Sequence, residues 1–282
     1  MSKLVPAAGD DAYVSIDFGG RTYTVDQRDT VFITSWLSSL DPSDPAVGCW
    51  VEHGLGRIEA CRQLVFRISR YLDLPGARAL DVGCQTGALL IALGAMEAHA
   101  CGVEPTVHAL EAARRRTRDW GLPASLTASV GEALPFREEA FDLVTLIDVL
   151  EHVSDIQETL REAVRVLRPG GALVIQAPNR FSPQWFLRDP HYGLFGVSIF
   201  RGSMVRRYVE WRRGRPGYDV GVFPVGIRIV AELERLGCQS QVLTGRLVAS
   251  LIKGKANNAA VAVLKYMQLT IGSLFTIVAT KT

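Results

Sequence analysis

In Ala79-Leu80-Asp81-Val82-Gly83-Cys84-Gln85-Thr86-Gly87, a short apolar run leads into a turn that carries two glycines. The pattern predicts a buried strand, a glycine-bearing turn and a helix that begins near Thr86. The next apolar run ends on Glu104, which lies 23 residues after Asp81. An acidic residue about 20 residues beyond a glycine turn is typical of nucleotide-binding α/β units, where its carboxylate accepts hydrogen bonds from two ribose hydroxyls. We therefore expect a ligand that contains a nucleoside.

The turn lacks the glycine spacing of a dinucleotide site. Such a site has Gly-x-Gly-x-x-Gly, which lets bare backbone approach a pyrophosphate at a helix N-terminus. Here the spacing is Gly83-x-x-x-Gly87, with Gln85 between the glycines and Asp81 just before the turn. The carboxylate of Asp81 would repel a pyrophosphate and attract a cation. The sulfonium and α-ammonium groups of S-adenosylmethionine are both cationic.

The segment resembles motif I of the class I S-adenosylmethionine-dependent methyltransferases, and four further segments extend the resemblance in order along the chain. They are similar to segments of the small-molecule O-methyltransferases of quinone pathways and natural products. The four segments are Val130-Gly131-Glu132-Ala133-Leu134-Pro135-Phe136, Phe141-Asp142-Leu143-Val144, Asp148-Val149-Leu150-Glu151-His152-Val153 and Arg165-Val166-Leu167-Arg168-Pro169-Gly170-Gly171.

The resemblance implies an α/β fold with a doubly wound, Rossmann-like, seven-stranded and mostly parallel sheet. We expect an N-terminal helical cap section over residues 1–75 and a methyltransferase domain over 76–282. An insertion after the fifth strand, at about 178–225, is expected to cover the substrate. The apolar stretch 256–279 predicts a helix and a closing core strand, with no membrane span. The alternation of apolar runs predicts strands near 78–82, 100–104, 125–129, 141–147 and 172–177.

The composition is that of an ordinary soluble enzyme. The formal net charge is +2, and 21% of the 282 residues are charged, so the overall charge does not indicate a nucleic-acid or membrane partner. The five cysteines are odd in number and form no Cys-x-x-Cys, which favours a reducing compartment. The first residues lack the apolar run of a signal peptide. We therefore expect a cytoplasmic protein.

The resemblance also assigns the cofactor contacts. Asp81 and Glu104 are expected at the methionine end and the ribose, and Gly131 is expected to donate its N–H to the adenine ring. The family often has an acidic residue where this chain has Val130, so the partner of the adenine amino group stays open. Arg57 is either a contact of the cofactor's carboxylate or a solvated helix arginine. The full set is Arg57, Asp81, Gly83, Cys84, Gln85, Gly87, Glu104, Pro105, Val130, Gly131, Glu132, Asp148 and Val149.

Two histidines are candidate catalytic bases. Methyl transfer is an in-line displacement from an activated sulfonium, so positioning supplies most of the catalysis. A hydroxyl acceptor must still lose its proton, and an imidazole is the natural base near neutral pH. His191 lies in the insertion, where a substrate would approach, and His152 follows the fourth strand of the predicted core. Each could instead be a structural histidine.

A divalent metal is a second cofactor that the sequence allows. Asp148, Glu151 and His152 have the spacing i, i+3, i+4, so one helical turn would place them on one face. Two carboxylates and an imidazole could then hold the ion with open positions for a catechol-like substrate. The same letters could instead line the pocket or cap the next helix.

Arginines gather in the insertion around Tyr208 and Trp211, and they could face an anionic substrate or a membrane surface. A solvated helix face is the more common explanation for such a cluster. They are Arg201, Arg206, Arg207, Arg212, Arg213 and Arg215.

The sequence favours a methyltransferase that acts on a small molecule, at a hydroxyl of a secondary metabolite or a sugar. A quinone or lipid-linked phenol is the alternative acceptor. The alternative of another class is a cofactor-binding partner protein without activity. A nucleic-acid substrate is disfavoured, because methylases of exocyclic base nitrogens carry an Asn/Asp-Pro-Pro-Tyr motif where this chain has Asp148-Val149-Leu150-Glu151.

Overall fold

The structure is a computed structural model that divides into two compact units, Met1–Ser129 and Val130–Thr282. These units differ from the predicted division at residue 75, and that division stays a prediction. The described residues are 13–40, 51, 54, 57–122, 124–200, 202–214, 216, 220–243 and 258–282.

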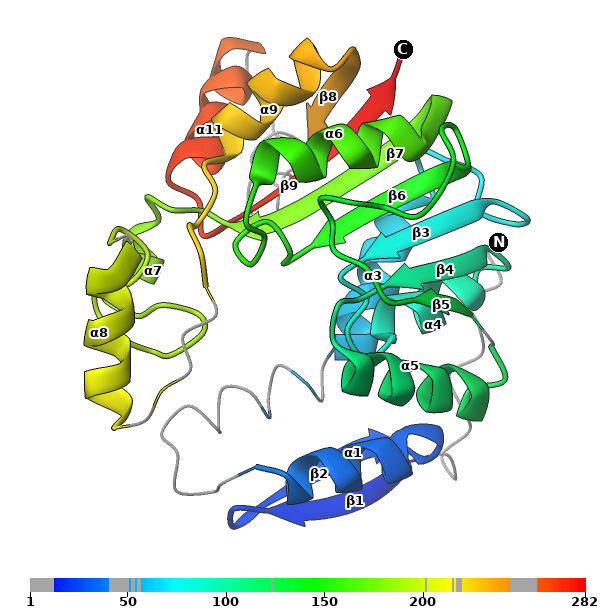
Figure 1. The fold of residues 1–282 in the computed structure, drawn as a ribbon, viewed down its shortest axis with the longest axis vertical. Helices are drawn as coiled ribbons and strands as arrows, with labels where there is room; N and C mark the ends of the chain where they lie inside the picture. Colours follow the sequence, from blue (N-terminus) through cyan, green and yellow to red (C-terminus); the bar gives the residue numbers. More distant parts are fainter. Residues whose placement is uncertain are drawn as a thin grey trace. The chain divides into compact units, whose positions relative to one another are not determined.

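The core is a seven-stranded sheet in the order β5-β4-β3-β6-β7-β9-β8 (Figure 1). The pairs β3–β4, β4–β5 and β6–β7 are parallel, whereas β9 runs antiparallel to both β7 and β8. The predicted fold class is confirmed. The strands are β3 (Arg78–Val82), β4 (His99–Val103), β5 (Ser125–Thr127), β6 (Phe141–Ile147), β7 (Leu167–Pro178), β8 (Cys238–Val242) and β9 (Leu274–Lys281).

The first unit begins with an antiparallel hairpin, β1 (Tyr13–Phe18) and β2 (Arg21–Asp26), which the expectation of a helical N-terminal section missed. Gly19 and Gly20 form its turn, with φ values of 57° and 75°. Two glycines between alternating residues are a strong hairpin signal, because only glycine adopts this turn without strain. The hairpin leads into η2 (Gln27–Asp29) and α1 (Thr30–Ser38).

Three helices complete the described part of the first unit: α3 (Arg57–Ile68), α4 (Ala88–Gly94) and α5 (Val107–Asp119). Helix α3 buries one apolar face, which consists of Ile58, Cys61, Leu64, Val65 and Ile68. Helix α4 follows the glycine-bearing turn, and its apolar residues Ala88 to Leu93 are all buried.

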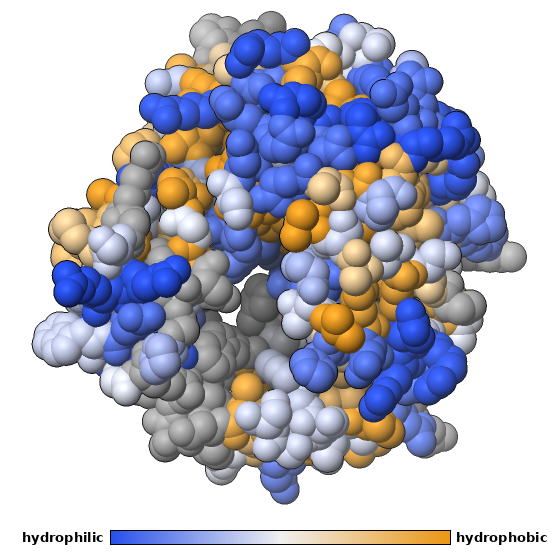
Figure 2. All heavy atoms as spheres, viewed as in Figure 1, coloured by the Kyte–Doolittle hydropathy of each residue, from blue (hydrophilic) through white to orange (hydrophobic). Residues whose placement is uncertain are grey.

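In the second unit, α6 (Ile156–Val166) lies across β6 and β7 (Figure 1). Its outward face is hydrophilic (Figure 2), and it buries apolar residues such as Leu160 and Val164. Helix α9 (Gly226–Arg235) and helix α11 (Asn258–Thr270) precede β8 and β9. Within the described residues, no helix is both long enough and apolar enough to cross a membrane. The predicted helix and closing strand near the C-terminus are thus confirmed.

The predicted insertion follows β7 and contains α7 (Pro183–Leu187) and α8 (Gly202–Arg213). It has a small apolar core of its own, because several valines and one phenylalanine pack together there. Its role of covering the substrate stays a prediction. The buried residues of this core are Val197, Val205, Val209, Val220 and Phe223.

The packing between β4 and α4 predicts a strong effect at Gly102. An ideal Cβ on Gly102 would lie 2.7 Å from Cys84 Sγ and 2.9 Å from Leu90 Cδ1. Gly102→Ala should lower the free energy of unfolding by about 1–3 kcal/mol, because the added methyl overpacks the core. Urea denaturation measures the change. Cys84→Ala in the same chain should recover part of the loss because it frees volume beside residue 102, and an unchanged unfolding midpoint in the single variant would contradict the packing.

Candidate functional site

The turn after β3 has an unusual backbone that depends on its glycines. Gly83, Gln85 and Gly87 all have positive φ, at 73°, 45° and 80°. Glycine adopts this region without strain, but a glutamine there must be held by other contacts. The N–H groups of Gly83 and Cys84 both donate to the carbonyl of Val103, at 2.7 and 3.0 Å. The end of β4 thus fixes the start of the turn.

Glu104 supplies the contact that holds Gln85. Its Oε2 accepts a hydrogen bond from Gln85 N at 3.2 Å, and its Oε1 accepts one from Thr106 N at 3.0 Å. Only 7% of Glu104 is exposed. Each carboxylate oxygen can accept a second hydrogen bond. Glu104 can therefore bind two hydroxyls while it holds the turn, as the predicted ribose contact requires.

The turn lies in a negative electrostatic environment. Burial, followed by the nearby carboxylates of Asp81 and Glu104, raises the pKa of the Cys84 thiol well above its usual range. Asp81 is itself buried, and it lies beside Gly102 in the β3–β4 register. Two carboxylates so close to a turn favour a cationic ligand over a phosphate. The structure thus supports the electrostatic argument made from the sequence.

The end of the turn packs against α5. An ideal Cβ on Gly87 would lie 3.2 Å from Ala113 Cβ and 3.3 Å from Thr117 Cγ2. Gly87 also precedes the first residue of α4 and has a left-handed conformation. This position therefore favours glycine for both space and backbone geometry.

Arg57 and Pro105 occupy element boundaries in the first unit. Arg57 is the first residue of α3 and is partly buried. Pro105 is exposed in the short connection between β4 and α5. Their cofactor contacts stay predictions.

The predicted adenine contacts lie in the second unit. Val130 is 45% exposed, and the adjacent Gly131 is buried. Glu132 Oε1 accepts hydrogen bonds from the N–H groups of Ser154 and Asp155, at 2.7 and 3.2 Å. Glu132 therefore anchors the residues that precede α6. Its cofactor contact stays a prediction.

Asp148 and Val149 follow β6, but the predicted helical turn from Asp148 to His152 is wrong. Asp148 has a φ of 57°, and its N–H donates to Gln176 O at 2.8 Å. This bond continues the pairing of β6 with β7 past the end of the strand. Because the chain leaves the sheet in a left-handed conformation, i, i+3, i+4 spacing does not place the three side chains on one helix face.

The structure brings three potential metal ligands together: Glu151, His152 and His191. One ligand atom from each lies within 4.8 Å of the others. Among the described residues, Asp148 is not in this group, and His191 lies beside Glu151 and His152 instead. Metal binding by Asp148, Glu151 and His152 stays a prediction. The spacing within one short segment could not identify His191, because it enters from the insertion.

The two candidate bases are neighbours. The rings of His152 and His191 meet edge to face, with centroids 5.2 Å apart and an interplanar angle of 83°. The Phe223 ring also meets the His191 ring edge to face, with centroids 5.6 Å apart. This contact comes from the small core of the insertion. The two histidines were predicted separately, and the structure brings them together.

Asp189 holds His191 in place, and the sequence reasoning missed it. Asp189 Oδ1 accepts hydrogen bonds from the N–H groups of His191 and Tyr192, both at 2.9 Å. Asp189 is 2% exposed, and burial raises its pKa although backbone hydrogen bonds to residues 191, 192 and 194 oppose the shift. The Asp-Pro pair at 189–190 is a turn signal that could have found it.

His152 also lines a pocket of about 750 Å³ in the second unit. The first turn of α6 forms one wall, and Ser203 and Arg206 of α8 contribute from the insertion. Gly221 completes the wall, and its N–H donates to Glu151 O at 2.7 Å. The polar side chains that line the pocket are those of His152, Ser154, Asp155, Gln157, Ser203 and Arg206.

Comparison with solved structures supports the fold. An S-adenosylmethionine dependent methyltransferase from Mesorhizobium loti superposes with a TM-score of 0.54 over 79% of this chain and 100% of its own, at 16% identity. The PH0226 protein from Pyrococcus horikoshii OT3 superposes with a TM-score of 0.55 over 80% of this chain and 90% of its own, also at 16% identity. At such identities the likeness extends to the fold alone.

Sequence comparison identifies the family. Residues 80–175 match the family model described as a methyltransferase domain. A ubiquinone biosynthesis O-methyltransferase from Methylocella silvestris is 32% identical over 146 residues, which cover 51% of this chain and 55% of that relative. A ubiquinone biosynthesis O-methyltransferase from Azorhizobium caulinodans is 28% identical over 66% of this chain and 68% of that relative. The chain thus spans about half the length of the first of these relatives.

The family match covers the glycine-bearing turn, Glu104 and the segment with Glu151 and His152. Together with the seven-stranded sheet, the match identifies residues 80–175 as a class I S-adenosylmethionine-dependent methyltransferase domain.

Proposed function

We propose that the protein transfers the methyl group of S-adenosylmethionine to a hydroxyl group of a small molecule. The cofactor half of this proposal rests on the turn after β3. Glu104 keeps acceptor capacity for the ribose hydroxyls, and the carboxylates of Asp81 and Glu104 make the turn attractive to the cofactor's cationic groups.

The chemistry is a single displacement. The acceptor oxygen forms a bond to the methyl carbon as the bond from carbon to sulfur breaks, and S-adenosylhomocysteine leaves. The hydroxyl proton must pass to a base, because an alkoxide or phenolate is a far stronger nucleophile than its acid. No external oxidant or reductant is required.

The observation that carries the choice of a hydroxyl acceptor is the contact between His152 and His191. Asp189 accepts a hydrogen bond from the backbone N–H of His191, and this contact fixes the backbone that carries the candidate base. His152 lines the pocket of the second unit and is the second candidate base.

The names of the relatives bear on the acceptor class. Both relatives named above are ubiquinone biosynthesis O-methyltransferases, and this name favours the phenolic alternative over a sugar or other secondary metabolite. Arg206 in the pocket suits an acceptor that also carries a negative charge. A cofactor-binding partner protein without activity remains the alternative of another class, and turnover of any acceptor would reject it.

A divalent metal at Glu151, His152 and His191 is a competing use of the same imidazoles. A ring nitrogen that binds a metal cannot also accept a proton. Oxygen and nitrogen donors of this kind suit a divalent ion, which would lower the pKa of a bound hydroxyl. The location in the cytoplasm and the absence of a nucleic-acid partner stay predictions.

The assignment of Glu104 predicts a loss of cofactor binding. Glu104→Ala should weaken binding of S-adenosylhomocysteine by about 1–3 kcal/mol, because it removes charge-assisted hydrogen bonds to the ribose. Isothermal titration calorimetry measures this directly. Glu111→Ala, which changes an exposed glutamate on α5, is the matched control and should bind like the wild type. Equal affinity of the Glu104 variant would remove Glu104 from the site.

The assignment of His191 predicts a loss of turnover with little change in cofactor affinity. His191→Ala should lower kcat on a phenolic acceptor by about 10²-fold, the lower range for the loss of a general base. The wild-type rate should fall in acid, since an imidazolium cannot accept the proton. His108→Ala, at an exposed histidine of α5, controls for nonspecific effects. Normal turnover by the His191 variant would leave His152 as the base to test.

The metal alternative predicts a dependence on divalent ions. If Glu151, His152 and His191 bind a metal, EDTA should abolish turnover and Mg²⁺ or a similar ion should restore it. Glu151→Gln should then require a higher metal concentration for half-maximal activity. Full turnover by metal-free protein would reject the metal and support proton transfer to a histidine.

A further inference from the structure

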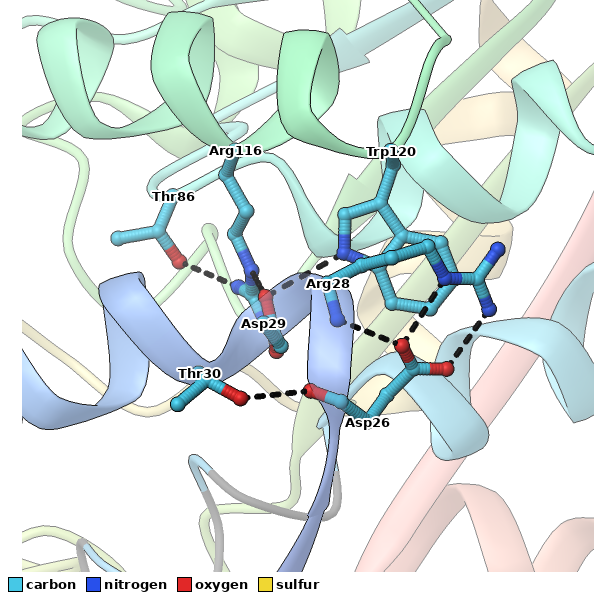
Figure 3. Close-up of polar contacts among 7 residues, drawn as sticks. All are labelled: Asp26, Arg28, Asp29, Thr30, Thr86, Arg116 and Trp120. Carbon is cyan, nitrogen blue, oxygen red and sulfur yellow. Dashed lines mark hydrogen bonds and ion pairs between the residues drawn. The ribbon is translucent and has the colours of Figure 1, made fainter. Parts of the chain in front are cut away.

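A buried ion pair joins the N-terminal section to α5 in the first unit (Figure 3). Arg116 Nε donates to Asp29 Oδ1 at 2.6 Å, and Arg116 Nη2 donates to Asp29 Oδ2 at 2.5 Å. Arg116 is 2% exposed and Asp29 is 5% exposed. The two residues are 87 positions apart in the sequence. The pair therefore makes a two-pronged, water-excluded contact between distant segments.

Aromatic side chains surround this pair. The Arg116 guanidinium lies over the Phe32 ring at 4.2 Å, and Trp120 Nε1 is 3.4 Å from Asp29 Oδ1. The Arg28 guanidinium lies over the Trp120 ring, with its Cζ atom 3.8 Å from the ring centroid. These contacts fix the plane of the Arg116 guanidinium, which leaves its remaining nitrogen with a defined direction.

That remaining nitrogen reaches the turn after β3. Arg116 Nη1 donates to Thr86 Oγ1 at 3.1 Å (Figure 3). Thr86 lies between Gln85, whose N–H binds Glu104, and Gly87, which packs against Ala113 of α5. Helix α5 thus contacts the turn through one hydrogen bond and one close packing contact.

A pair of this kind adds little net stability. The cost of removing both charges from water is close to the gain from their attraction, and an apolar pair of the same size often stabilises a fold as well. What the ion pair adds is geometry, because a forked hydrogen bond allows only one orientation of the guanidinium. The orientation is the one that meets Thr86.

We propose that Asp29 and Arg116 are positioning residues that hold the cofactor-binding turn through Thr86. The N-terminal section, residues 13–38, would then set the affinity for the cofactor without touching it. This inference rests on the proposed use of the turn for S-adenosylmethionine. It adds a series of hydrogen bonds from Asp29 through Arg116 to Thr86, and none of these residues is a predicted cofactor contact.

The physical reason is preorganisation. Gln85 has a left-handed backbone, which a free chain would populate rarely. When only a fraction of molecules has the binding-competent turn, the apparent dissociation constant rises by the inverse of that fraction. The hydrogen bond from Arg116 to Thr86 restricts the turn before the cofactor arrives.

Thr86→Val tests the link with a small change, because valine keeps the shape of the side chain and replaces the hydroxyl with a methyl group. We expect the dissociation constant for S-adenosylhomocysteine to rise about 3- to 10-fold, the effect of one lost hydrogen bond. Thr86→Ser should restore binding since it keeps the oxygen. Thr117→Val is the matched control: its hydroxyl donates to Ala113 O within α5, and the methyl next to Gly87 is retained.

A double-mutant comparison tests the route of the effect. Asp29→Asn should also weaken binding in the wild type, and it should weaken it less in the Thr86→Val chain, where the link is already broken. The KM for S-adenosylmethionine should rise in both single variants while kcat at saturating cofactor stays within about twofold. A purely structural role would not produce this split. If Asp29→Asn prevents folding, the variants at Thr86 and Thr117 test the inference by themselves.

The outcomes are distinct. Equal affinity of the wild type and Thr86→Val for S-adenosylhomocysteine overturns the inference, as do strictly additive effects of the two substitutions. Weaker binding by Thr117→Val than by Thr86→Val also overturns it. Failure of the wild type to bind S-adenosylhomocysteine contradicts instead the cofactor assignment of the proposed function.

Discussion

The carboxylate of Glu104 is the contact on which the first unit depends. It accepts hydrogen bonds from Gln85 N and Thr106 N, so one buried group joins the turn after β3 to the start of α5. The left-handed backbone of Gln85 requires such a partner, because the surrounding glycines alone would leave it mobile. In the proposed function, the same side chain also accepts hydrogen bonds from the ribose hydroxyls.

Two groups of acids in the first unit have different electrostatic roles. The charge of Asp29 is neutralised by Arg116 in a buried, forked contact. Burial raises the pKa of the Cys84 thiol in the turn, and the nearby carboxylates of Asp81 and Glu104 raise it further. A cationic ligand lowers the energy of that arrangement. In the two proposals, the first group orients the backbone of the turn and the second attracts the cofactor.

In the second unit, the insertion positions the His191 ring from its own small apolar core. Val197, Val205 and Phe223 pack within it, and Phe223 also contacts the His191 ring. Buried Asp189 fixes the backbone of His191 through hydrogen bonds from N–H groups. His152 meets His191 from the end of β6, a separate element. The arrangement of the two imidazoles therefore depends on how the insertion folds, and less on the local sequence of either one.

The sequence by itself determined strands β3 to β7 and β9, the glycine-bearing turn and the acid at Glu104, because apolar runs and glycine turns are signals that act over a few residues. The Gly19-Gly20 hairpin was equally local, and its signal was missed. Only the tertiary structure decided that Asp148 leaves β6 in a left-handed conformation, that His191 joins His152, and that Asp29 meets Arg116. Each of these depends on pairing between residues far apart in the chain. Such pairing follows from packing and burial, which no periodicity within a short segment encodes.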